Sequence, residues 1–116
     1  MLFRSQIDGV IELDGEYYLV EVKFLSEPVS VNDVSRHLVR VFNRDSSRGI
    51  FISATHYSEA ALETCKDSLT KAVVVLCMLE EIVHLLEREG DLEKFLKAKV
   101  QAAIVDRKPL HLIREP

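Results

Sequence analysis

The chain has 116 residues, which is enough for one domain with a single hydrophobic core. Hydrophobic residues make up 47% and charged residues 29%, as in ordinary soluble globular proteins, so a disordered or fibrous chain is excluded. The formal net charge of −4 argues mildly against a dedicated high-affinity nucleic-acid binder, which usually carries a basic surface.

The sequence also indicates where the protein resides. The longest apolar run, residues 72–79, is too short to span a bilayer, and the first residues do not resemble a secretory signal. Cys65 and Cys77 fit no metal-ligand spacing and are expected to be buried free thiols. We therefore expect a cytoplasmic protein with no membrane partner.

The first predicted element is a β-hairpin over residues 6–24. Asp14-Gly15 stands between two runs of alternating apolar residues, and this dipeptide favours a type I′ turn, which needs positive φ at both central positions. One face of this hairpin is expected to be apolar and to pack on the core. Its members would be Ile7, Ile11, Leu13, Tyr18, Val20, Val22 and Phe24.

The same turn sets the register of the polar face. Continued along both strands, it places Asp8 directly opposite Glu21, with Lys23 on the same face as Glu21. Opposed like charges destabilise a sheet, so we expect a compensating cation, either a divalent metal ion or Lys23 alone. On this view, replacing either carboxylate by its amide should leave stability unchanged or raise it. The alternative is a solvated cluster of surface charges without function.

A helix is predicted from Ser30 to about Asn43. Ser30 followed three residues later by Asp33 is typical of an N-cap with an acidic first turn. Apolar residues recur at helical spacing and are expected to form the buried face. They are Val31, Val34, Leu38, Val41 and Phe42.

Three arginines are spaced by four residues on the other side of this helix: Arg36, Arg40 and Arg44. They form either a solvated face or a stripe that binds phosphate groups, because arginine can bind phosphate oxygens with two parallel hydrogen bonds. His37 is most simply interpreted as a surface or boundary histidine.

The rest of the chain alternates between strands and helices, which predicts parallel pairing through crossover connections. We expect strands over residues 48–53 and 72–78, and helices over residues 59–70, 79–89 and 91–105. The apolar stripe of the last helix either packs on its own domain or meets a second copy of the chain. In the tail, Leu110, Leu112 and Ile113 could add a short edge strand.

Asp8, followed after twelve residues by Glu21-Val22-Lys23, resembles the PD-(D/E)xK nuclease signature, with Ile-Asp in place of Pro-Asp. Further segments are similar in order and spacing to Mrr-like restriction endonucleases. Residues 49–53 and 57–62 look like the third core strand and next helix of that family, and residues 73–76 and 79–82 look like its last core strand and following helix.

The resemblance implies an α/β fold with a restriction-endonuclease-like core, in which an N-terminal hairpin and parallel strands form a mixed central sheet flanked by helices. It predicts a single domain over residues 1–116, with the core at about 5–88 and an extra C-terminal helical extension at 90–116. In the family a helix precedes the first core strand and often supplies another acidic residue. Only seven residues precede Asp8 here, which is too few for that helix. We therefore expect either that the helix is absent or that the chain is part of a longer protein with this helix or another domain.

The resemblance also implies a function. It suggests a Mg²⁺- or Mn²⁺-dependent endonuclease acting on DNA, with Asp8, Glu21 and the Val22 carbonyl as metal ligands. The ion and Lys23, the third catalytic residue, would position and activate water and stabilise charge on the attacked phosphate. Arg36, Arg40 and Arg44 would then be DNA contacts. The alternatives left open are an inactive nuclease-fold module that binds DNA or a protein partner, and a structural or homodimerisation module.

Overall fold

The protein is described here from a computed structural model, which covers residues 8–44 and 47–113. The strands are β1 (Gly9–Leu13), β2 (Glu16–Lys23), β3 (Ser47–Ser53) and β4 (Val74–Met78). The helices are α1 (Val31–Phe42), α2 (Glu59–Ser68), α3 (Leu79–Glu87) and α4 (Leu92–Val105). The predicted helices and the strands of the sheet are present in the described ranges, with boundaries within a few residues of those expected, whereas the edge strand expected in the tail is reduced to one isolated bridge at Leu110. No helix of this part of the chain is long and apolar enough to cross a membrane.

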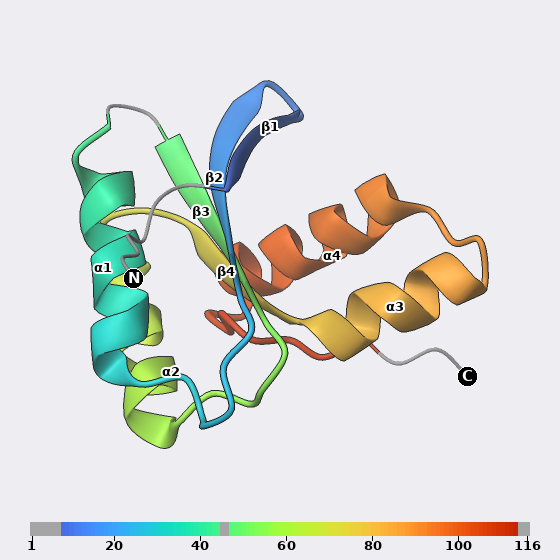
Figure 1. The fold of residues 1–116 in the computed structure, drawn as a ribbon. Coiled ribbons are helices and arrows are strands. Elements are labelled where there is room, and N and C mark those ends of the chain that lie inside the picture. Colours follow the sequence, from blue (N-terminus) through green and yellow to red (C-terminus); the bar gives the residue numbers. More distant parts are fainter. Residues whose placement is uncertain (1–7, 45–46, 114–116) are drawn as a thin grey trace.

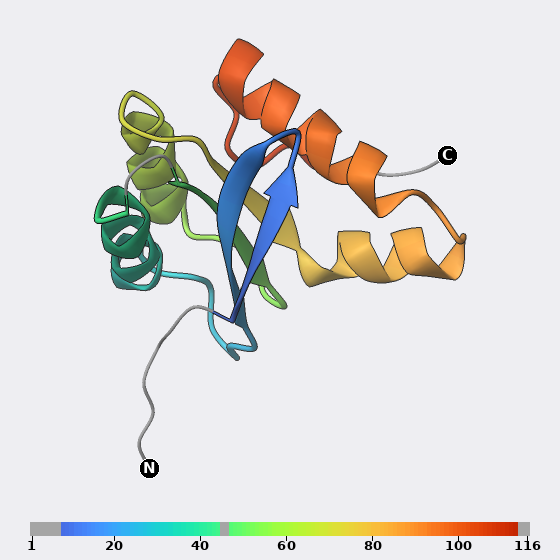
Figure 2. The ribbon, with the colours of Figure 1, turned by 90° about the horizontal axis from the view of Figure 1, so that it is seen from above.

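Within the described ranges the strands form one mixed sheet in the order β1-β2-β3-β4. The β1–β2 pair is antiparallel, whereas β2–β3 and β3–β4 are parallel. Helices α1 and α2 cover one face of the sheet, and α3 and α4 lie on the other side (Figures 1 and 2). This arrangement confirms the predicted α/β fold with an N-terminal hairpin, parallel strands and an extra C-terminal helix.

The hairpin has the predicted turn and register. Asp14 and Gly15 have φ values of 56° and 82°, the positive values that a tight I′-type turn needs. Leu13 pairs with Glu16, and the register continues without a slip to Gly9. The turn chemistry and the apolar alternation therefore specify the same pairing, as expected when one face is buried.

Both faces of the sheet are buried, each in its own hydrophobic cluster. The cluster on the α4 side includes Leu13, Tyr18, Ile50, Val75, Phe95, Leu96 and Ala103. The cluster on the α1–α2 side includes Val34, Leu38, Phe51, Ala61, Cys65 and Leu76. On the face of β2 that carries Glu21, Leu19 and Glu21 are buried on the α1 side, whereas Tyr17 near the hairpin turn is 56% exposed.

Helix α1 begins as predicted but buries a different set of residues. Ser30 accepts a hydrogen bond from the Asp33 amide, and the Asp33 carboxylate accepts one from the Ser30 amide. The buried face consists of Val34, His37, Leu38 and Val41. The prediction that Phe42 is buried is wrong, because its side chain lies at the exposed end of the helix.

The hairpin also departs from the prediction at its open end. Phe24 is 75% exposed, and it follows the last residue of β2, so it is not part of the paired strand. Its assignment to the buried apolar face is wrong. Ile7, assigned to the same face, lies outside the described residues.

The C-terminal extension is fastened to the sheet by a buried charge pair that the apolar pattern did not reveal. Lys99 is completely buried, and its Nζ donates to Glu81 Oε1 at 2.7 Å and to the carbonyls of Leu76 and His111. The tail then runs beside β4, where Leu110 forms an isolated parallel bridge with Leu76. In the predicted apolar stripe of α4, Phe95 and Leu96 pack on the sheet of their own domain, whereas Leu92 and Ile104 are 44% and 52% exposed.

The two cysteines are buried and free, as predicted. Burial raises the pKa of Cys65 and of Cys77 to about 12. Both thiols therefore stay protonated at neutral pH and belong to the hydrophobic core.

Candidate active site

Glu21 lies on β2 at the centre of the sheet face covered by α1. It pairs with Phe51 of the parallel neighbour β3 and is only 1% exposed. A buried carboxylate must be compensated by nearby donors or positive charge, because its transfer from water is costly. The interpretation of this residue as part of a solvated surface cluster is therefore wrong.

Three cationic or imidazole groups surround the Glu21 carboxylate. Nδ1 of His37 lies 3.2 Å from Oε1, and the guanidinium of Arg40 lies 3.5 Å from the same oxygen. Nζ of Lys23 lies 3.5 Å from Oε2. Oε2 is buried and makes no hydrogen bond with the described residues. One oxygen is thus held by α1, and among the described residues the other is approached by the lysine of its own strand.

These neighbours determine the acidity of Glu21. Burial alone would raise the pKa of this carboxyl group, but His37, Lys23 and Arg40 together outweigh burial and hold the pKa below its ordinary value of 4.5. The group is therefore an anion at neutral pH. A buried anion with one oxygen free of hydrogen bonds is suited to bind a cation.

Asp8 lies where the regular pairing of the hairpin ends. Its amide donates to the carbonyl of Val20, which is the partner of Gly9 in the register, so Asp8 is not set squarely opposite Glu21. The Asp8 carboxylate instead accepts a hydrogen bond of 2.7 Å from the Val22 amide. It therefore lies beside the peptide that joins Glu21 to Val22.

The donor set can be tested against the chemistry of a divalent ion. Mg²⁺ is usually held by one or two carboxylates together with water and phosphate oxygens. The described residues contain no cluster of three or more His, Cys, Asp or Glu side chains that could hold a metal ion. The unbonded Oε2 of Glu21 and the nearby Asp8 carboxylate fit an open Mg²⁺ site of this kind, and they do not fit a closed protein cage.

The three arginines predicted to form one stripe have different environments. Arg36 is exposed and pairs with Asp33 in the first turn of α1. Arg40 reaches Glu21 and also donates to the Arg36 carbonyl. Arg44 lies past the end of α1 and lines a pocket.

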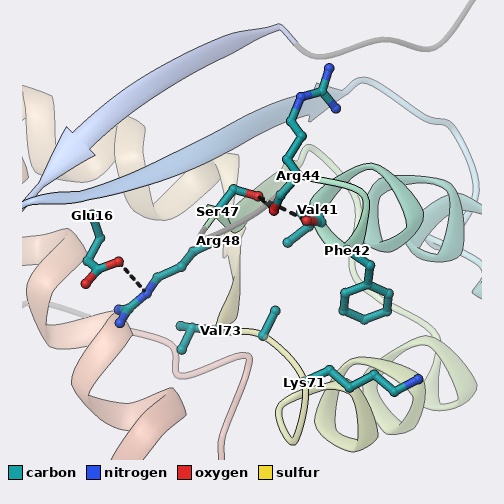
Figure 3. A pocket seen from close by; sticks show the side chains of 9 residues that line it. Glu16, Val41, Phe42, Arg44, Ser47, Arg48, Lys71 and Val73 are labelled. Atoms are coloured by element: carbon teal, nitrogen blue, oxygen red, sulfur yellow. Dashed lines mark hydrogen bonds and ion pairs between the residues drawn. The ribbon is translucent and has the colours of Figure 1, made fainter.

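That pocket, of about 590 Å³, lies at the end of the sheet away from Glu21. It is formed where α1 ends and β3 begins, and Arg44, Arg48 and Lys71 line it together with apolar side chains (Figure 3). Arg48 is engaged there by Glu16 at 3.5 Å and by the Tyr18 hydroxyl at 3.0 Å. This pocket is therefore separate from the candidate site.

Comparison with known proteins decides the family. A family model described as restriction endonuclease matches residues 4–86, which is most of the chain. The chain belongs to the restriction endonuclease family. No curated protein and no solved structure matches the chain.

Family membership gives the residues of the hairpin their context. The resemblance to PD-(D/E)xK nucleases rests on Asp8 and Glu21-Val22-Lys23, and the structure of this restriction endonuclease domain gathers these residues at the open end of the hairpin.

Sequence reasoning missed the contacts that two residues make with Glu21, namely those of His37 and of Arg40, which was expected only as a DNA contact. His37 is buried against Glu21 and is not a surface or boundary histidine. Arg40 turns toward the same carboxylate and leaves the expected outer stripe. The available signal was the position of His37, which is three residues from Val34 and four from Val41 and so shares the buried face of α1.

The surroundings of Glu21 lead to a different prediction from the sequence, which suggested that replacing this carboxylate by its amide leaves stability unchanged or raises it. Because cations and not a second carboxylate dominate its surroundings, Glu21→Gln should lower the free energy of unfolding at pH 7, on the order of 1–3 kcal/mol. A lowered pKa in the folded state means that this stabilisation is fully present above pH 4.5 and is lost as the pH falls through the lowered value. Urea unfolding of both proteins between pH 7 and pH 3 measures the difference, which should shrink below pH 4.5. A difference that stays constant or grows on acidification would contradict this assignment.

Proposed function

We propose that this restriction endonuclease domain is a metal-dependent nuclease that hydrolyses phosphodiester bonds of DNA. The observation that carries the proposal is the state of Glu21, a buried anion with one oxygen held by α1 and the other without a hydrogen bond among the described residues. Such a carboxylate beside Lys23 is costly to maintain for structure alone, since a fully bonded partner set would stabilise the fold better.

The proposed metal ligands are Glu21, Asp8 and the carbonyl of Val22, with Mg²⁺ or Mn²⁺ as the ion. A bound ion of this kind supplies Lewis acidity and lowers the pKa of a coordinated water molecule. Lys23 is the proposed catalytic partner. Its ammonium group, close to Oε2 of Glu21, can orient water and stabilise negative charge that develops on an attacked phosphate.

DNA is the proposed substrate and partner, and Arg36, Arg40 and Arg44 remain its proposed contacts. Arg36 has the most direct access to a phosphate backbone, because its side chain is 53% exposed. Arg40 would contact DNA closer to the proposed metal site, because its guanidinium also contacts Glu21. Arg44 would reach DNA only if the backbone extended toward the far end of α1.

A second candidate is an inactive nuclease-fold module that binds DNA or a protein partner. It is favoured by the hydrogen bond from the Val22 amide to Asp8, which occupies one oxygen of a proposed ligand. The two candidates differ in metal-dependent cleavage, whereas both allow DNA binding.

The first test is cleavage of plasmid and linear DNA with Mg²⁺ or Mn²⁺. The wild-type protein should cleave in the presence of either ion and should be inactive with EDTA. Glu21→Gln should abolish cleavage, and Lys23→Met should reduce the rate by about 100- to 1000-fold, as expected when a group that stabilises transition-state charge is removed. Lys94→Met, which removes an exposed lysine of α4, serves as the matched control.

The outcomes separate the two candidates. DNA binding without cleavage under all metal conditions would favour the inactive module. Cleavage that is retained in Glu21→Gln would contradict the proposed site.

A further test concerns the arginine contacts. If Arg36 and Arg44 each neutralise one phosphate, Arg36→Ala/Arg44→Ala should reduce the slope of log K against log salt concentration by about two units for every DNA sequence tried. Arg40 is left intact because it contacts Glu21. The control Lys94→Ala/Lys108→Ala removes the same charge from exposed positions in the C-terminal extension. Equal slopes for the two double variants would mean that the arginines belong to a solvated face. Fluorescence anisotropy at several salt concentrations measures these slopes.

A further inference from the structure

We propose that His37 is a positioning residue for Glu21, which holds one carboxylate oxygen so that the other is presented to the metal ion. This inference rests on the proposed function and adds a residue that lies outside the hairpin signature. It assigns a role to the one buried imidazole of the described residues.

The contacts of His37 point to this role. The side chain is 1% exposed, and Nδ1 lies 3.2 Å from Oε1 of Glu21. A carboxylate oxygen only accepts hydrogen bonds, so the proposed contact needs the ring hydrogen on Nδ1. Both ring nitrogens are buried, and neither makes a hydrogen bond of regular geometry with the described residues, so the 3.2 Å approach to Glu21 is the polar contact of this ring. The ring is therefore directed at Glu21 and at no other polar group there.

The imidazole of His37 packs against β3 at Gly49, where no side chain occupies the space. A Cβ atom at Gly49 would lie 2.8 Å from Nε2 of His37, closer than such atoms pack. Phe51, two residues along the same strand, meets the ring edge-on with 5.7 Å between centroids. The missing side chain and the aromatic edge together fix the orientation of the imidazole.

The two oxygens of the Glu21 carboxylate therefore have different surroundings. Oε1 is shared by His37 and by Arg40, which lies one turn further along α1. Oε2 is faced by Lys23 alone, at 3.5 Å, and has no hydrogen bond among the described residues. Partners that orient a metal ligand from behind commonly change metal affinity by about 10- to 100-fold when they are removed.

A packing role and a positioning role predict opposite effects for two substitutions. Leucine has nearly the volume of histidine but no N–H group, so His37→Leu preserves packing and removes the contact to Oε1. Asparagine is smaller, but its side-chain amide can place an N–H group where Nδ1 lies, so His37→Asn loses packing and preserves the contact.

The experiment is calorimetric titration of Mn²⁺ into the metal-free protein, with urea unfolding in EDTA as the measure of packing. We expect His37→Leu to weaken Mn²⁺ binding by about 10- to 100-fold, whereas His37→Asn recovers most of the affinity although it is the less stable variant. His84→Leu, at an exposed histidine of α3, should bind Mn²⁺ like the wild-type protein. Should His37→Leu not fold, His37→Gln replaces it, because its amide reaches the position of Nε2 and not that of Nδ1.

Each outcome bears on one claim. Wild-type affinity in His37→Leu, or affinity in His37→Asn no better than in His37→Leu, would overturn the positioning role and leave the proposed function intact. Absence of Mn²⁺ binding to the wild-type protein would overturn the proposed function and this inference with it.

Discussion

The burial of the Glu21 carboxylate is the constraint on which this half of the protein depends. An isolated carboxylate in a protein interior costs several kcal/mol, so the chain must bring compensating groups to it. Helix α1 supplies His37 and Arg40, and β2 itself supplies Lys23. The capping box that starts α1 fixes where this helix begins, and Gly49 lets it approach the sheet closely enough for the contact.

A second buried carboxylate provides an internal comparison. Oε1 of Glu81 accepts from Lys99 and from the Met78 amide, and Oε2 accepts from the Ile113 amide. Both oxygens are thus bonded, and the group ties α4 and the tail to the edge of the sheet. Glu21 is bonded at one side only. The hydrogen bonds of Glu81 thus stabilise the fold, whereas the arrangement of Glu21 suits the binding of a cation.

The fold was predictable because its signals are local. The Asp14-Gly15 turn, the N-caps at Ser30 and Ser58 and the apolar period of each element agree with one another, and the structure contains all of them. The parallel strands and the family were likewise indicated by the order of the elements.

The site was less predictable because its contacts are not local. His37 meets Glu21 across sixteen positions of the chain, and Lys99 meets Glu81 across eighteen, so neither pair follows from a periodic pattern. The approach of Asp8 to the Val22 amide depends on how the strand departs from its register, which the turn does not specify. The exposure of Phe24 similarly depends on where β2 ends, which the apolar alternation does not specify.

The central claim is that Glu21 is a metal ligand that α1 holds in place. A crystal of the protein soaked with Mn²⁺ tests it most directly, because anomalous scattering locates the ion independently of any model of the site. The account predicts one strong peak within bonding distance of Oε2 of Glu21 and next to the Asp8 carboxylate, with Oε1 still in contact with His37. No peak at this position, or an ion bound elsewhere while Glu21 contacts only Lys23, His37 and Arg40, would contradict it.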